Sequence, residues 1–194
     1  MMDKTQFRKH IRDIKKRYSA SELRQMSEPL TNELLANDAV RSASAILLYW
    51  SLPDEVYTHD IVRQLAKEGR TVLLPKVQPD NTLTLHRYTG DADMTCGAYG
   101  IMEPATPALT DDERDTLFGK GSVSIISGMA FSADGHRLGR GKGYYDHLMS
   151  QLTATFKIGL GFDFQIFKEI PHDDHDIRMD CVWHLANIPC KKQK

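Results

Sequence analysis

An uninterrupted apolar segment constrains the fold of this chain more than any other feature of its sequence. Residues 45–50 read Ala-Ile-Leu-Leu-Tyr-Trp. A run of this length without polar alternation is typical of a strand that is buried on both faces of a sheet, as in a parallel sheet covered by helices. The pattern predicts further strands at residues 71–74, 83–88, 122–127 and 156–160. The segment 89–114, rich in Gly, Pro and Asp, indicates irregular loops.

Helical patterns alternate with these strands. Phe7, Ile11, Ile14 and Tyr18 recur at helical spacing, which predicts an amphipathic first helix. Its other face is basic, with cations at positions 4, 8, 9, 12, 15, 16 and 17. A capping box at residues 19–22 predicts a second helix that runs to about residue 37. A third helix follows a cap at Thr58, and a fourth covers residues 143–152.

The alternation of strands and helices predicts an α/β fold, Rossmann-like, with a mainly parallel sheet that carries helices on both faces. Nothing in the sequence resembles a linker or an internal repeat, so we expect a single domain over residues 1–194. In open sheets of this type, ligands bind at the carboxyl ends of the strands. The loops that follow the strands are therefore the first place to look for chemistry.

Composition narrows the classes of partner. The 194 residues include 25 Lys and Arg against 26 Asp and Glu, a formal net charge of -1. This balance gives no reason to expect nucleic acid or an anionic membrane as a partner. The three cysteines form no CxxC pair, the first residues lack a signal-peptide pattern, and no run approaches the roughly 20 apolar residues of a membrane span. The sequence thus predicts a soluble cytoplasmic protein that acts on small molecules, expected as a monomer.

The chemistry is concentrated in the segment 128–146, between a predicted strand and a predicted helix. It holds four closely spaced glycines and three cations, namely Gly135, Gly139, Gly141, Gly143, Arg137, Arg140 and Lys142. Glycines let backbone N–H groups approach an anion, and cations and a helix N-terminus add positive charge, so the loop is suited to phosphate. It fits neither common nucleotide motif: a P-loop needs Ser or Thr after the lysine, and a GxGxxG motif needs Gly at Tyr144. An ordinary surface turn remains the alternative.

Residues 131–146, Phe-Ser-Ala-Asp-Gly-His-Arg-Leu-Gly-Arg-Gly-Lys-Gly-Tyr-Tyr-Asp, closely resemble the signature of the 5-formyltetrahydrofolate cyclo-ligase family, also called methenyltetrahydrofolate synthetase. Three other segments resemble the family's motifs in the expected order. They are the Lys4 to Arg8 pattern, the acidic turn Asp54-Glu55, and the acidic motif at residues 175–180. The resemblance spans nearly the whole chain.

The resemblance implies an enzyme that cyclises 5-formyltetrahydrofolate to 5,10-methenyltetrahydrofolate. ATP is the co-substrate, Mg²⁺ the cofactor, and ADP and phosphate the other products. Because an amide-like oxygen leaves poorly, the expected route phosphorylates the formyl oxygen to an imino-phosphate, which N10 then attacks. Catalysis would then depend on positioning and on neutralising a transferring phosphoryl group.

The resemblance also implies the site residues. ATP would be bound by Lys4, Arg8, Arg137, Leu138, Gly139, Arg140, Gly141, Lys142, Gly143, Tyr144 and Tyr145. The folate substrate would contact Trp50, Glu55, Arg140, Gly141, Lys142, Gly143 and Tyr144. Arg140, Lys142 and Tyr144 would be the catalytic residues, and Asp146 and Asp176 the metal ligands.

Structural roles are the alternatives at several of these positions. Lys4 and Arg8 could belong to a solvated basic face, Trp50 and Tyr144 could be packing residues, and Asp176 could lie in a solvated acidic loop. Two other functions also stay open. One is a non-catalytic nucleotide-binding or folate-binding protein, and the other is a sugar-phosphate isomerase-like enzyme on a related fold.

Overall fold

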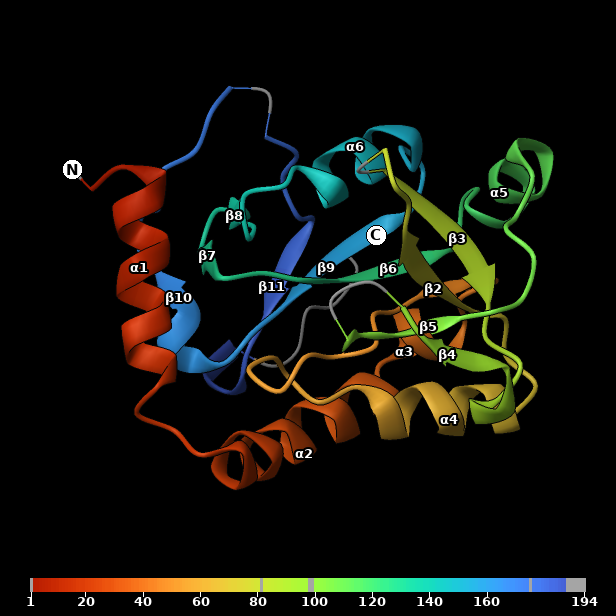
Figure 1. The fold of residues 1–194 in the computed structure, drawn as a ribbon, viewed down its shortest axis with the longest axis horizontal. Coiled ribbons are helices and arrows are strands. Elements are labelled where there is room, and N and C mark those ends of the chain that lie inside the picture. The colour runs from red at the N-terminus through yellow and green to blue at the C-terminus, as the bar shows by residue number, and fades with distance from the viewer. Residues whose placement is uncertain (1, 81, 98–99, 175, 188–194) are drawn as a thin grey trace.

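The centre of the molecule is a six-stranded sheet. The computed structural model describes residues 2–80, 82–97, 100–174 and 176–187 (Figure 1). The strand order is β11-β9-β6-β1-β2-β3, and neighbouring strands are parallel except for the antiparallel pair β2 and β3. The strands are β1 (Ile46–Leu47), β2 (Val72–Val77), β3 (Leu83–Arg87), β6 (Val123–Ser127), β9 (Phe156–Leu160) and β11 (Cys181–Trp183).

Helices cover both faces of this sheet. In Figure 1, α2 and α4 run below the sheet, and α5 and α6 lie above it. The helices are α1 (Lys4–Lys15), α2 (Ala20–Ala36), α3 (Asp38–Arg41), α4 (His59–Lys67), α5 (Asp111–Leu117) and α6 (Tyr144–Gln151). The predicted α/β class, with a mainly parallel sheet and helices on both faces, is confirmed.

The two cores follow from the alternation of side chains along each strand. Successive residues of a strand point to opposite faces of its sheet. Ile46 and Leu48 therefore pack in the core that holds the apolar faces of α2, α3 and α4. Ala45 and Leu47 pack in the other core, with Leu148 of α6. Burial on both faces explains why this segment is apolar throughout.

Helix α1 packs on a second, smaller sheet instead of on the central one. This sheet has the order β10-β7-β8, with β7 (Ala130–Ser132), β8 (Arg137–Leu138) and β10 (Ile166–Phe167). Ile11 of α1 is fully buried against Ala130 and Leu138 of this sheet. Figure 1 shows α1 at the left, beside β7, β8 and β10. The glycine-rich segment is thus partly a hairpin, and not the continuous loop that the sequence predicts.

Three local predictions are wrong. The predicted strand at residues 45–50 is a strand only at Ile46–Leu47. Thr58 stands at the start of α4, but its hydroxyl donates to the Tyr49 carbonyl and does not cap the helix. The predicted loop at residues 89–114 contains a short 3-10 helix (Asp91–Asp93), the hairpin of β4 (Met94–Cys96) and β5 (Met102–Pro104), and the start of α5. The Thr58 hydroxyl and the paired residues of β4 and β5 thus take hydrogen-bond partners that the local pattern does not indicate.

Other local predictions hold closely. Ser19 caps α2 through the predicted capping box with Glu22, and α6 begins one residue after the predicted start. The sequence analysis did not predict β10, β11 or the short 3-10 helices Asp163–Gln165 and Leu185–Asn187. The prediction of one domain over 1–194 extends into residues 188–194, which lie outside the described residues.

Within the described part of the chain, no helix combines the length and the hydrophobicity that crossing a membrane requires.

Candidate active site

The predicted site residues come from four segments that meet near the carboxyl edge of the central sheet. Strands β1 and β6 are parallel, so their carboxyl ends lie at the same edge. The turn with Asp54 and Glu55 follows β1, and the glycine-rich segment follows β6. Helix α1 and the acidic loop around Asp176 complete the group through side-chain contacts with each other and with the glycine-rich segment.

Helix α1 contributes the predicted pair Lys4 and Arg8. The Lys4 ammonium donates to Asp173 at 2.7 Å and to Asp176 at 2.6 Å. Burial lowers the pKa of Lys4, but the two carboxylates outweigh burial and raise the pKa above its ordinary value. The Arg8 Nε donates to the Gly139 carbonyl at 2.9 Å. Lys4 therefore contacts the acidic loop and Arg8 the glycine-rich segment, and their predicted contacts with ATP stay predictions.

Gly141 lies against the Arg8 guanidinium. A Cβ at this position would stand 3.2 Å from the Arg8 Cζ, and the Gly141 φ of +103° is one that other residues rarely adopt. Glycine is the residue that allows both this backbone conformation and the close approach of the arginine. The glycine at this position thus lets a cation from α1 lie directly against the loop.

Arg140 is held by the acidic turn. Its Nη2 donates to Asp54 at 2.6 Å and to Glu55 at 3.2 Å. Burial lowers the pKa of the Arg140 guanidinium, while Glu55 and Asp54 raise it, and the net shift is upward. The Arg140 side chain is still 43% exposed, whereas that of Glu55 is 9% exposed. The structure thus joins the predicted phosphate-binding loop to the predicted folate-binding turn.

Sequence reasoning missed Lys15. It was expected on the solvated basic face of the first helix, but its side chain is only 5% exposed. Its ammonium donates to the Asp54 carbonyl at 2.7 Å and to the Asp54 carboxylate at 3.1 Å. Burial lowers the pKa of Lys15 below its ordinary value. Lys15 stands four residues after the buried Ile11, at the edge of the apolar face of α1, whereas the next residue, Lys16, has a side chain that is 76% exposed. This i, i+4 spacing is the signal that could have singled out Lys15.

Arg137 and Leu138 are buried beneath the glycine-rich segment. The Arg137 side chain is 4% exposed, donates to Asp146 at 3.0 Å, and lies over the Tyr145 ring. Its Nη1 would be 2.7 Å from a Cβ at Gly139, so a side chain there would displace it. Leu138 packs in the core under α1. These side chains support the loop from below, and their predicted contacts with ATP stay predictions.

The remaining loop residues lie nearer the surface. Gly143 has a φ of +72° and directly precedes α6, and Lys142 is exposed. Tyr144 is half-buried. The Tyr145 hydroxyl is hydrogen-bonded to Ser127, and burial raises the pKa of this phenol. Of this group, Lys142 presents its charge to solvent.

Trp50 is half-buried beside the acidic turn. His59 stacks on its ring at 3.9 Å between centroids, and the Arg63 guanidinium lies 5.1 Å from the ring centroid. Trp50 also packs against the main core. The ring thus has aromatic and cationic neighbours of its own, and its predicted contact with the folate stays a prediction.

The two predicted metal ligands offer the hard oxygen donors that Mg²⁺ prefers. Asp146 Oδ1 pairs with Arg137, and Asp176 Oδ2 pairs with Lys4. Among the described residues, no cluster of three His, Cys, Asp or Glu side chains could hold an ion by itself. Mg²⁺ commonly needs only one or two carboxylates, because water and substrate phosphates complete its shell. The donor set therefore fits a metal that binds together with a nucleotide. His175, in the same acidic motif, lies outside the described residues.

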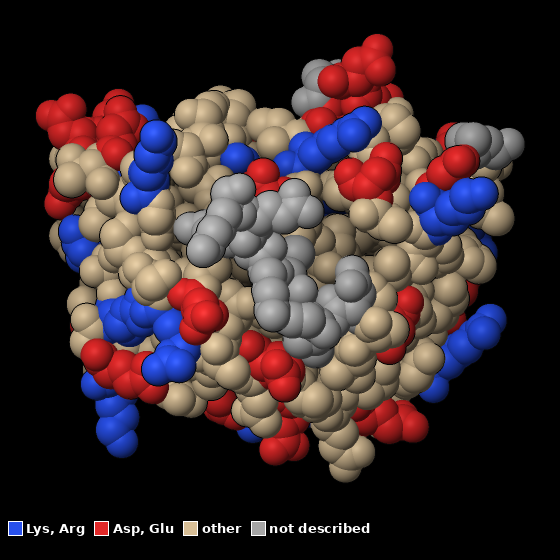
Figure 2. Space-filling model, turned by 180° about the vertical axis from the view of Figure 1, so that it is seen from behind, with Lys and Arg blue, Asp and Glu red and all other residues tan. Residues whose placement is uncertain are grey.

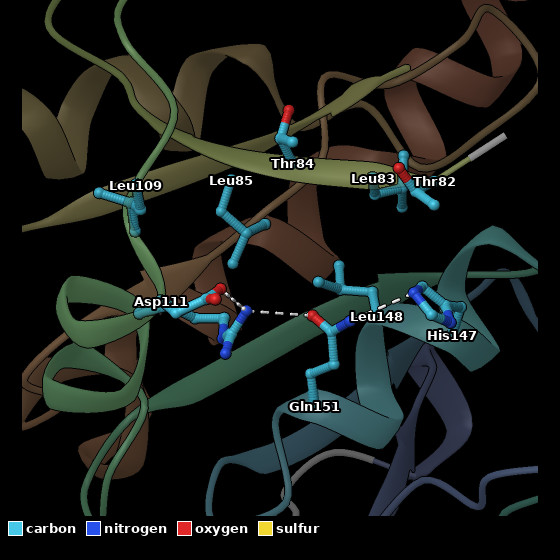
Figure 3. Close-up of a pocket in the computed structure, with 10 residues that line it drawn as sticks. Thr82, Leu83, Thr84, Leu85, Leu109, Asp111, His147, Leu148 and Gln151 are labelled. Carbon is cyan, nitrogen blue, oxygen red and sulfur yellow. Dashed lines mark hydrogen bonds and ion pairs between the residues drawn. The ribbon is translucent and has the colours of Figure 1, made fainter. Parts of the chain in front are cut away.

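A cavity among the described residues lies away from the predicted site. It has a volume of about 250 Å³ between β3, α5 and α6, and Leu85 and Leu148 face each other across it (Figure 3). Arg114, Gln151 and Asp111 bond to one another at its rim. None of the predicted site residues lines it. At the site itself, cations and carboxylates pair with each other.

On the face of the molecule that Figure 2 shows, charge is not gathered into one large patch. Figure 2 shows basic and acidic side chains interspersed over the face opposite to that in Figure 1, in keeping with the net charge of -1. The paired cations and carboxylates of the site are therefore a local feature. With the fold, they define an α/β enzyme whose polar groups gather at the carboxyl edge of the sheet.

Comparison with known proteins gives the family. The chain matches the model of the 5-formyltetrahydrofolate cyclo-ligase family over residues 1–184. A 5-formyltetrahydrofolate cyclo-ligase of Mus musculus is 30% identical over 175 residues, 84% of each chain, and one of Haemophilus influenzae is 29% identical, covering 89% of this chain and 92% of the relative. The chain therefore belongs to the 5-formyltetrahydrofolate cyclo-ligase family, and it is a ligase.

Solved structures agree. The structure of 5,10-methenyltetrahydrofolate synthetase from Aquifex aeolicus superposes with a TM-score of 0.81 at 29% identity, covering 96% of this chain and 91% of that one. A synthetase from Mycoplasma pneumoniae superposes with a TM-score of 0.72 at 24% identity, which supports the fold alone. The resemblance on which the sequence analysis relied is confirmed at the level of the family.

Proposed function

We propose that this chain converts 5-formyltetrahydrofolate and ATP to 5,10-methenyltetrahydrofolate, ADP and phosphate, with Mg²⁺ as cofactor. The formyl oxygen attacks the γ-phosphorus of ATP, and the bond to ADP breaks, which gives an imino-phosphate. N10 then adds to the former formyl carbon and loses its proton. Phosphate departs with the former formyl oxygen, so the ring closes and all atoms are accounted for.

The observation that carries this proposal is the ion pair between Arg140 and the Asp54-Glu55 turn. A reaction between two bound molecules needs groups for both at one place. Arg140 stands on the loop suited to phosphate, and Glu55 offers a carboxylate to the donor-rich pterin edge of a folate. Their contact supports a site in which the two ligands meet.

Each group has a role in this proposal. Lys4, Arg8 and the segment from Arg137 to Tyr145 bind ATP, and the buried Arg137 and Leu138 also support the rest of the loop. Arg140 offers a planar fork to the transferring phosphoryl group, and Lys142 offers a point charge. Tyr144, Trp50 and Glu55 contact the folate. Asp146 and Asp176 would hold Mg²⁺, which neutralises phosphate charge when bound.

The deciding experiment follows the near-ultraviolet absorbance of 5,10-methenyltetrahydrofolate. Purified protein is mixed with 5-formyltetrahydrofolate, Mg²⁺ and ATP, and matched samples omit ATP or Mg²⁺. We expect the signal to grow only in the complete mixture. No ATP-dependent signal would refute the proposal. If Mg-ATP still raised the melting temperature, a non-catalytic nucleotide-binding protein would be favoured, whereas stabilisation by sugar phosphates would favour an isomerase-like enzyme.

Asp176→Asn is expected to raise the Mg²⁺ concentration for half-maximal rate by roughly tenfold or more, because an amide is a weaker ligand than a carboxylate. The measurement is the rate at fixed ATP over a Mg²⁺ titration. Asp173→Asn is the matched control, since Asp173 also pairs with Lys4 but its side chain is 55% exposed. The same Mg²⁺ requirement in both variants would show that Asp176 is not a metal ligand.

A further inference from the structure

Lys15 is a buried cation that the proposed reaction does not use. It stands in the last turn of α1 with a side chain that is 5% exposed. Burying an ammonium group is costly unless it is paired and hydrogen-bonded. Here Asp54 meets both needs, through its carbonyl at 2.7 Å and its carboxylate Oδ2 at 3.1 Å. Lys15 is therefore anchored on one residue of the acidic turn.

The Asp54 carboxylate is divided between two cations. Its Oδ2 faces Lys15, and its Oδ1 accepts from Arg140 at 2.6 Å. Arg140 in turn reaches Glu55 at 3.2 Å. The four groups carry two positive and two negative charges, and they join α1, the turn after β1 and the glycine-rich segment. Lys15 is the buried cation of these four groups, and Arg140, whose side chain is 43% exposed, is the exposed cation.

Removing Lys15 would change the charge that Arg140 experiences. Arg140 would then be the cation that faces two carboxylates, and the carboxylates would hold it more firmly. The Asp54 carboxylate would also lose Lys15, the fixed partner that orients it. To contact an anionic ligand, the Arg140 guanidinium must turn away from Asp54 and Glu55. This movement costs less free energy when Lys15 already neutralises part of the charge of Asp54.

We propose that Lys15 is a positioning residue of the ligase reaction, which fixes and neutralises Asp54 and thereby sets the position of the Arg140 guanidinium for the transferring phosphoryl group. This inference rests on the proposed function. Lys15 touches neither ligand in this scheme, and it acts through Asp54 on Arg140. Its effect is therefore expected in the chemical step more than in binding.

The first test compares Lys15→Met with Lys16→Met. Lys16 is the next residue of the chain, with a side chain that is 76% exposed and paired with Asp13, so it is a matched control. We expect Lys15→Met to lower kcat by about tenfold, while the KM values for ATP and 5-formyltetrahydrofolate change by less than about twofold. Lys16→Met is expected to match the wild type. Thermal unfolding checks that both variants are folded.

The pH profile gives a readout that a purely structural role would not move. Burial raises the pKa of Asp54, but the charges of Lys15 and Arg140 outweigh burial and hold that pKa below its ordinary value. Without Lys15 the carboxyl binds its proton more readily, so its pKa rises. The acidic limb of the kcat profile is therefore expected to shift to higher pH in Lys15→Met and to stay in place in Lys16→Met.

Asp54→Asn tests whether Lys15 acts on Arg140 through Asp54. It also tests the proposal if Lys15→Met does not fold. We expect kcat to fall at least as far as in Lys15→Met. Combining the two changes is expected to lower kcat little further, because both remove the same interaction of Lys15 with Arg140 through Asp54. An unchanged kcat in Asp54→Asn, or fully additive losses, would overturn the inference. So would equal kcat values and pH profiles for Lys15→Met and Lys16→Met. If the wild type itself shows no turnover, the proposed function fails first.

Discussion

Replacing Lys142 by alanine is expected to lower kcat by roughly 10²- to 10³-fold with no change in the melting temperature. Lys142 is exposed, and it stands one residue before Gly143, at the start of α6. A surface lysine that supports no packing contributes little to stability. A cation that faces a transferring phosphoryl group contributes mainly to the transition state, so its loss should reduce kcat more than it raises KM.

Lys120→Ala is the matched control for this prediction. Lys120 is also exposed, but it stands three residues before β6 begins and thus lies near the opposite edge of the sheet from the glycine-rich segment. The measurement is the steady-state rate of both variants, with thermal unfolding measured in parallel. It separates the loss of a phosphate-binding cation from the loss of an ordinary surface cation. A Lys142→Ala variant that turns over like Lys120→Ala would show that the segment is not the phosphate site.

Phe131→Ala is expected to reduce the free energy of unfolding by about 3–5 kcal/mol, the range for deleting a large buried aromatic side chain. Phe131 is fully buried in β7. Its ring lies against three glycines. A Cβ at Gly128, Gly159 or Gly161 would stand 2.7 Å, 2.5 Å or 3.1 Å from ring atoms. The three glycines have no side chains of their own that could fill the space, so we expect a cavity to remain.

Urea unfolding measures this loss, and Phe131→Leu is the control because leucine retains most of the apolar volume. We expect Phe131→Leu to lose less than half as much stability as Phe131→Ala. A loss below about 1 kcal/mol for Phe131→Ala would contradict the packing described here, since such a value is typical of sites that can collapse or that are exposed. The ring also supports β7, which begins the hairpin that carries the glycine-rich segment.

The sequence predicted the features that depend on neighbours along the chain. The apolar run at residues 45–50 predicted a strand buried on both faces, and Ala45 and Leu47 do pack on the face opposite to Ile46 and Leu48. The capping box of Ser19 and Glu22 predicted the start of α2. Such signals are local, because periodicity and capping involve residues only a few positions apart.

The sequence could not predict the features that depend on partners distant in the chain. Thr58 looked like a helix cap, but the fold brings its hydroxyl to the Tyr49 carbonyl. Arg137 is one of the three cations of the predicted phosphate loop, and the structure shows that it is buried and paired with Asp146. A charged side chain in a motif does not reveal whether it faces a ligand or a carboxylate of the same protein.

The sequence by itself determined the α/β class and the family, because these follow from the hydrophobic period and from a long continuous motif. Only the tertiary structure decided which charges meet. Lys15, Asp54 and Arg140 come from three distant segments, and their contacts follow from α1 packing on the small sheet and from β1 and β6 ending at one edge. Ion pairs act over a few ångströms of space, so no spacing along the chain could have identified them.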